Sequence, residues 1–184
     1  MRHPALVLIA TLSALTGGVL WVIKSLAILV ADSQPEYTFE LALACFGVAT
    51  LGIVDKVRSS KGATRTVTII ACMAALSGIA AAVTYLAAGD NDAFGLLAMA
   101  TAVSTLAVLF YGGRKVKAWS ALPFNLGCLY VLSLPAGGAL AAIDERLLEV
   151  PLLVVAMGWI ALAGRMASET RFGRVPPESL ASTG

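Results

Sequence analysis

The sequence has little charge. Of its 184 residues only 13% are Asp, Glu, Lys or Arg, whereas 59% are hydrophobic and the mean hydropathy is +0.87. A soluble domain carries about 25% charged residues, because water must solvate much of its surface. The deficit excludes a soluble enzyme, a disordered protein and a nucleic-acid-binding protein. It indicates a polytopic membrane protein whose surroundings are the lipid bilayer.

Residues that carry acid–base, nucleophilic or metal chemistry are also scarce. His3 is the single histidine and precedes the first apolar segment, which excludes paired haem ligation and a His-dependent hydrolase within the membrane. Cys45, Cys72 and Cys128 fall in three different apolar segments and form no C-x-x-C motif. The chain also lacks a glycine-rich phosphate loop. We therefore expect no enzymatic activity, no cofactor, no metal site and no nucleic-acid partner.

What the sequence does contain is six apolar segments, each long enough to cross a bilayer as a helix. Short polar breaks separate them, and their apolar runs are continuous, whereas the strands of an outer-membrane barrel alternate every second residue. The sequence therefore predicts an all-α fold, a compact bundle of six transmembrane helices within residues 1–164. A polar tail, 165–184, is expected to be a disordered cytoplasmic end. The predicted helices cover about 5–30, 37–54, 66–88, 93–111, 119–143 and 147–164.

Basic residues set the expected orientation, because Lys and Arg gather in cytoplasmic loops. If the N-terminus is cytoplasmic, eleven of the thirteen Lys and Arg residues lie on the cytoplasmic side, Arg146 lies outside, and Lys24 lies within a helix. This split predicts an inner-membrane protein with both termini in the cytoplasm. The eleven residues are Arg2, Lys56, Arg58, Lys61, Arg65, Arg114, Lys115, Lys117, Arg165, Arg171 and Arg174.

Lys24 is the one cation inside a predicted span, and an ionisable group there is costly and often functional. One interpretation is structural: its long stem carries the ammonium to the outer interface or into an ion pair, with Glu40 as the expected partner. The other is a role in a solute pathway. Ser13, Gly17, Leu20 and Lys24 share one helical stripe that could line a cavity.

The fifth segment is the most irregular. Pro135 precedes two glycines and could act as a gate or a substrate site, or it could be a packing kink. Pro123 is compatible with a first helical turn, and Asn125 is expected to bond to a neighbouring helix. Hydroxyl groups in the spans are expected to bond to carbonyls of their own helices. These are Thr50, Ser77, Thr84, Thr101, Ser104 and Thr105.

Small residues recur at spacings that let membrane helices approach closely. They include Ala10-x-x-x-Ala14, Ala74-x-x-x-Gly78-x-x-x-Ala82, Ala98-x-x-x-Ala102 and Ser133-x-x-x-Gly137-x-x-x-Ala141. In size and helix number the chain resembles the substrate-capturing subunits of energy-coupling-factor vitamin transporters, and Ala10-x-x-x-Ala14 resembles the spacing by which those subunits dock. The resemblance implies solute capture and a membrane partner.

Two functions are thus expected. The first is a small solute-handling protein, meaning a transporter, channel or capture subunit, with Lys24, Glu40, Asn125 and Pro135 as candidate pathway residues. The alternative is a non-enzymatic accessory subunit that packs against a membrane partner or a second copy of itself. The first predicts a cavity, whereas the second predicts small-residue stripes exposed on the outside of the monomer.

Overall fold

In the computed structural model the described residues are 4–58, 64–115 and 121–172, and they form six long helices and no strand. All six are long and apolar enough to cross a membrane, which confirms the predicted all-helical fold with six candidate spans. The helices are α1 (Pro4–Ala31), α2 (Thr38–Arg58), α3 (Thr64–Ala88), α4 (Asn91–Lys115), α5 (Leu122–Ala141) and α6 (Glu149–Phe172), with the short 3-10 helix η2 (Glu145–Leu148) before α6.

Local residue chemistry sets several helix ends. Gly89 ends α3 in the left-handed conformation, at φ 63°, and its N–H donates to the Tyr85 carbonyl. Asp90 then caps α4, because its carboxylate accepts hydrogen bonds from the N–H groups of Asp92 and Ala93. At the start of α5, Pro123 occupies the first turn, where a missing N–H costs nothing.

Several helices run past the predicted spans. Polar residues extend α2 to Arg58, α4 to Lys115 and α6 to Phe172, since apolar composition marks the membrane-crossing part and not the whole helix. Helix α6 thus includes the first residues of the expected disordered tail, and 173–184 lie outside the described residues.

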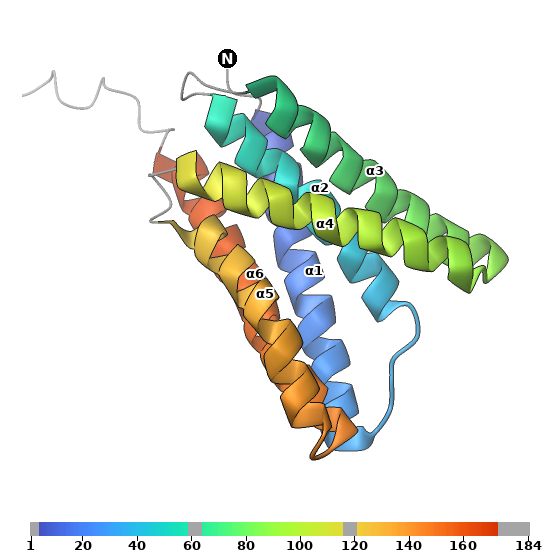
Figure 1. Ribbon diagram of the computed structural model, residues 1–184. Coiled ribbons are helices and arrows are strands. Elements are labelled where there is room, and N and C mark those ends of the chain that lie inside the picture. The colour runs from blue at the N-terminus through green and yellow to red at the C-terminus, as the bar shows by residue number, and fades with distance from the viewer. Residues whose placement is uncertain (1–3, 59–63, 116–120, 173–184) are drawn as a thin grey trace, which may run out of the picture.

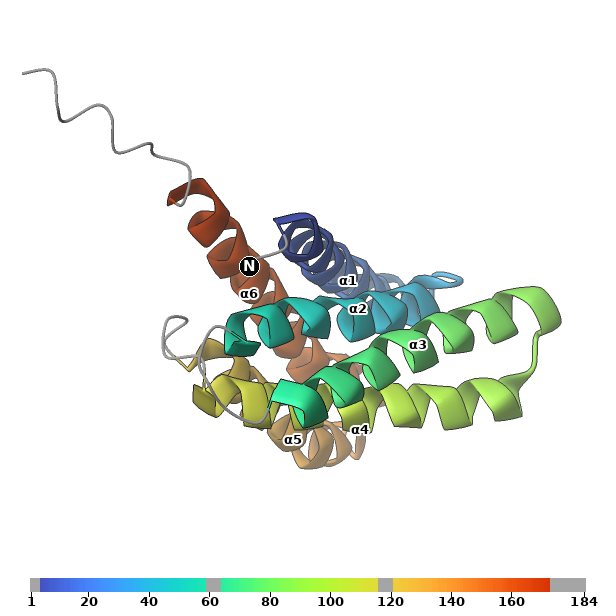
Figure 2. The ribbon, with the colours of Figure 1, turned by 90° about the horizontal axis from the view of Figure 1, so that it is seen from above.

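Five helices form a ring and the sixth lies outside it. Contacts run from α1 to α2, from α2 to α4, from α4 to α5, from α5 to α6 and from α6 back to α1, while α3 packs against α2 and α4. Figure 2 shows α3 on the outer side of α2 and α4. Helix α3 therefore lies outside the ring and supports one of its walls, while its buried Val67 and Ala71 join the core.

The two ends of the bundle differ in how closely the helices approach. At the closed end, which holds Pro4, Arg58, Lys115 and Leu122, a Cβ placed on Gly113 would lie 2.4 Å from the Phe124 backbone nitrogen. Toward the opposite, open end, which holds the last residues of α1, α3 and α5 and the first residues of α2, α4 and α6, α2, α3 and α4 diverge from α1, α5 and α6 (Figure 1). The ring is thus tight at one end and spread at the other.

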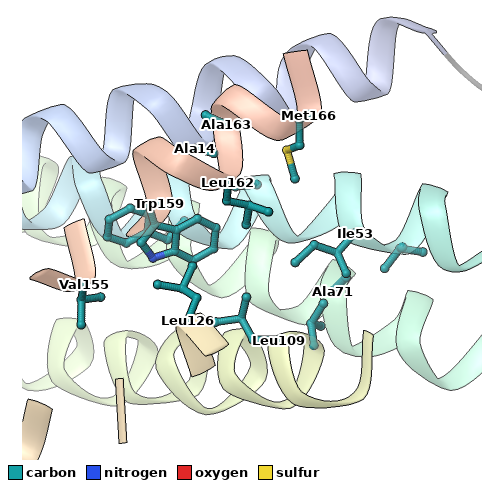
Figure 3. Close-up of a cluster of buried hydrophobic side chains, with 14 of the residues drawn as sticks. Ala14, Ile53, Ala71, Leu109, Leu126, Val155, Trp159, Leu162, Ala163 and Met166 are labelled. Atoms are coloured by element: carbon teal, nitrogen blue, oxygen red, sulfur yellow. The ribbon is translucent and has the colours of Figure 1, made fainter. Parts of the chain in front are cut away.

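The core lies in the middle of the ring and is built around Trp159. This fully buried indole points from α6 toward Leu126 of α5 and Leu109 of α4, as Figure 3 shows. Outside the ring, large apolar side chains such as Leu96, Leu132 and Leu134 are more than 60% exposed. Exposed apolar surface on this scale is typical of a lipid-facing protein surface.

Candidate functional site

Lys24 is buried in an ion pair that joins α1 to α6. Its Nζ lies 2.6 Å from Oε1 of Glu149, and the Ser25 hydroxyl donates to Oε2 of the same carboxylate at 2.7 Å. The side chains of Lys24 and Glu149 are 8% and 6% exposed, and the Lys24 ammonium also lies 5.8 Å from the centre of the Phe39 ring. The structural interpretation of Lys24 therefore accounts for its geometry.

The expected partner of Lys24 was wrong. Glu40 is buried in the first turn of α2, but the cation pairs with Glu149 instead. The reason is packing: α1 runs along α6, so the Lys24 side chain meets the first turn of α6. A carboxylate there is further stabilised by the positive end of the helix dipole.

The two candidates on α5 face away from the ring interior. Asn125 and Pro135 are both exposed, and α5 continues as one helix through Pro135 to Ala141. Beside the proline, Gly137 is buried and packs against the Leu148 side chain of η2. The surroundings of Pro135 thus fit a packing role, and its use as a gate stays a prediction.

A cavity of about 320 Å³ lies within the ring toward its open end. This volume is at the lower limit of the range typical of small-molecule sites, about 300–1,000 Å³. The lining carries no carboxylate, amine, imidazole or thiol. Its residues are Trp21 of α1; Phe39, Leu43 and Phe46 of α2; Gly95, Ala98, Met99, Ala102, Thr105 and Leu106 of α4; and Tyr130 of α5.

The cavity opens along α4, where the lining side chains are too small to close it. Gly95 and Ala102 are exposed, Met99 is 68% exposed, and a Cβ on Gly95 would meet nothing within 4 Å. If the helices span a bilayer, this mouth faces the acyl chains beside α4. A molecule dissolved in the lipid would then enter the cavity sideways.

An aromatic stack forms the inner wall of the cavity. Trp21 stacks on Phe46 at 5.3 Å between ring centres, and Phe46 stacks on Trp159 at 4.7 Å. Phe39 meets Trp21 edge to face at 5.5 Å. Because aromatic side chains have few rotamers and these rings pack on one another, the wall is preformed before any ligand arrives.

Two side chains that line the cavity each carry a buried polar atom without a hydrogen-bond partner. These atoms are the indole Nε1 of Trp21 and the hydroxyl Oγ1 of Thr105. The Tyr130 hydroxyl, also in the lining, accepts a bond from Nε1 of Trp159 at 3.3 Å and keeps its own hydrogen as a donor. Buried polar groups are almost always paired, so unpaired ones need an explanation.

The expectation for the span hydroxyls holds for several residues and fails at the cavity. Thr50, Ser77 and Thr101 each donate to a carbonyl of their own helix, as predicted. Thr105, one turn after Thr101, makes no such bond although its carbonyl partner would be available in a regular helix. In the sequence Thr105 looks like the other hydroxyl residues of the spans, but in the fold its hydroxyl has no hydrogen-bond partner.

Sequence reasoning missed the residues that build the cavity. None of Lys24, Glu40, Asn125 and Pro135 lines it. A usable signal was present in Trp21 and Phe46, since aromatic residues in membrane proteins gather at the interfaces and these two lie well inside predicted spans. Aromatic side chains at such depth are candidates for packing around a ligand.

Comparisons with known proteins add no function, since no protein-family model, no curated protein and no solved structure matches the chain. The resemblance to vitamin-capturing subunits is also weakened at its motif. Ala10 and Ala14 are fully buried inside the monomer, where Ala10 packs against Gly52 of α2. Within the described residues, no group of three or more His, Cys, Asp or Glu could hold a metal.

Proposed function

We propose that this chain is an integral protein of the cytoplasmic membrane that captures or transfers a small, uncharged and mostly apolar molecule. The observation that carries the proposal is the aromatic-walled cavity with its mouth on α4. A lining without ionisable acid–base groups other than the Tyr130 phenol favours binding over catalysis. With both termini in the cytoplasm, as the basic residues favour, the cavity lies in the outer half of the bilayer.

The accessory-subunit alternative is less well supported by the packing. It expects stripes of small residues on the outside of the monomer, free for a partner helix. Instead Ala74 and Gly78 are buried against α2, and Gly137 is buried against η2. These three small residues close the bundle on itself, whereas Gly95 and Ala102 of α4 are exposed beside the cavity.

The test is a binding experiment in nanodiscs with the flat hydrocarbon 2-isopropenylnaphthalene as probe, read by native mass spectrometry. Gly95→Leu places a side chain in the mouth, at a position where a Cβ meets nothing within 4 Å. We expect about one probe per chain in the wild type and loss of the bound probe in Gly95→Leu. Gly138→Leu is the matched control, because Gly138 is also exposed and unobstructed but does not line the cavity.

Two outcomes would contradict the proposal. One is no probe bound to the wild type, and the other is equal binding to the wild type and Gly95→Leu. Isolation of the chain in a fixed ratio with a membrane protein, together with either of these results, would support the accessory-subunit alternative.

A further inference from the structure

We infer that the molecule held in the cavity presents a hydrogen-bond acceptor, a carbonyl oxygen on a flat apolar body, to Trp21 and Thr105. This inference rests on the proposed function and names the chemistry of its ligand. It starts from the two unpaired polar atoms, which belong to residues only 5% and 3% exposed.

The kind of unpaired group limits the kind of ligand. An indole N–H is a donor only, a threonine hydroxyl can donate, and the free hydrogen of Tyr130 is a third donor. The cavity therefore offers donors and lacks a charged acceptor, which disfavours a ligand that brings an ammonium or other cation. A carboxylate or phosphate is disfavoured as well, because no cation lines the cavity to offset its desolvation. A neutral ligand oxygen that accepts a hydrogen bond satisfies both conditions, since it pairs with the donors and brings no charge.

The shape of the cavity limits the rest of the molecule. Phe39, Trp21 and Phe46 supply ring edges and faces on one side, and Ala98 and Ala102 supply a flat, shallow surface on the other. A planar ring system fits between such walls and buries apolar area on both faces. The ion pair of Lys24 and Glu149 lies beyond Phe39 and is already satisfied, so it does not compete for the ligand.

Paired residues elsewhere in the core show that the unpaired state is particular to the cavity. Trp159 belongs to the same aromatic stack as Trp21, yet its Nε1 has the Tyr130 oxygen as its acceptor. Thr50 is as buried as Thr105, yet its hydroxyl donates to the Gly47 carbonyl. Both unpaired groups occur on cavity-lining side chains, which is the arrangement expected if a ligand completes their bonding.

The experiment compares two probes of nearly the same shape, 2-acetylnaphthalene, which has a carbonyl oxygen, and 2-isopropenylnaphthalene, which has a CH₂ group in its place. Affinities are measured in nanodiscs for the wild type, Trp21→Phe and Thr105→Val. The ratio of the two affinities removes effects of shape and partitioning that the probes share. We expect the wild type to prefer the ketone by about tenfold, the effect of one well-made hydrogen bond.

Trp21→Phe and Thr105→Val are each expected to lower the preference for the ketone several-fold while leaving binding of 2-isopropenylnaphthalene nearly unchanged. Thr50→Val is the matched control, since it removes a buried hydroxyl that already has a partner and does not line the cavity, and it should keep the wild-type preference. If both probes bind equally to the wild type, or if the preference survives in both Trp21→Phe and Thr105→Val, water satisfies these groups and the inference is wrong. The proposed function would still stand if the hydrocarbon binds in a manner that Gly95→Leu blocks.

A carbonyl acceptor could come from a free molecule or from the ester of a membrane lipid, and the nanodisc lipid distinguishes the two. If a lipid ester occupies the cavity, replacing ester-linked by ether-linked lipids removes a competitor and raises the affinity for 2-acetylnaphthalene. Equal affinity in both lipids assigns the site to a free carbonyl compound. Absence of binding by both probes in both lipids would overturn the inference and the proposed function together.

Discussion

Along α4, the closed and open ends of the bundle use glycine in opposite ways. At the closed end Gly112 and Gly113 let α4 approach Ile53 of α2 and the backbone of α5. Toward the open end a Cβ placed on Gly95 would meet nothing within 4 Å, and the cavity lies beside this part of α4. On α4, glycine thus brings helices into contact at the closed end and leaves space beside the cavity at the open end, so one end of this helix supplies rigidity and the other supplies access.

The largest effect is expected at the buried ion pair, which ties α1 to α6 in the open half. Lys24→Met leaves the Glu149 carboxylate buried with only Ser25 as a partner, and loss of one member of a buried pair costs about 3–5 kcal/mol. The free energy of unfolding in mixed micelles, titrated with SDS and followed by circular dichroism, measures the loss.

The double variant Lys24→Met/Glu149→Gln is the control for that experiment. It removes both charges, so most of the lost stability should return. A double variant less stable than Lys24→Met would show that the pair itself, and not the stranded carboxylate, accounts for the loss. The open half would then be held together more strongly than its spread geometry indicates.

A smaller loss is expected from a methyl group at the closed end. In Gly113→Ala the new Cβ would lie 2.4 Å from a backbone atom of Phe124, so α4 and α5 must separate. Overpacking of this kind costs about 1–3 kcal/mol. The same SDS titration measures it.

Gly95→Ala is the matched change at the open end. It adds the same methyl group where nothing lies within 4 Å, and removing a glycine from a helix interior should stabilise the protein slightly. Similar losses for Gly113→Ala and Gly95→Ala would abolish the distinction between the two ends.

The sequence predicts the helices better than the site because helices depend on local composition. Continuous apolar runs and short polar breaks are enough to place six spans. The acid that pairs with Lys24 could not be chosen in the same way, since Glu149 lies far along the chain at the start of the sixth predicted helix and meets Lys24 only because α6 packs along α1. The cavity depends on how far α4 and α5 diverge, and the unpaired state of Thr105 depends on that packing too.

The smallest effect is expected at a second ion pair, between Asp32 just after α1 and Arg146 of η2. Arg146 lies 2.6 Å from Asp32, the same separation as Lys24 from Glu149, but its side chain is 44% exposed and that of Asp32 is 63% exposed. Exposed pairs contribute about 0.2–1 kcal/mol, because water and salt screen them. Arg146→Ala should therefore shift the unfolding midpoint little.

The salt dependence of these variants separates the two pairs. The small loss in Arg146→Ala should shrink further when the ionic strength is raised, whereas the loss in Lys24→Met should persist. Equal N–O distances would then give unequal stabilities, because burial decides how much each pair contributes. A loss in Arg146→Ala as large as that in Lys24→Met would mean that the polar connection at the rim, and not the buried pair, holds α1 and α6 together beside the cavity.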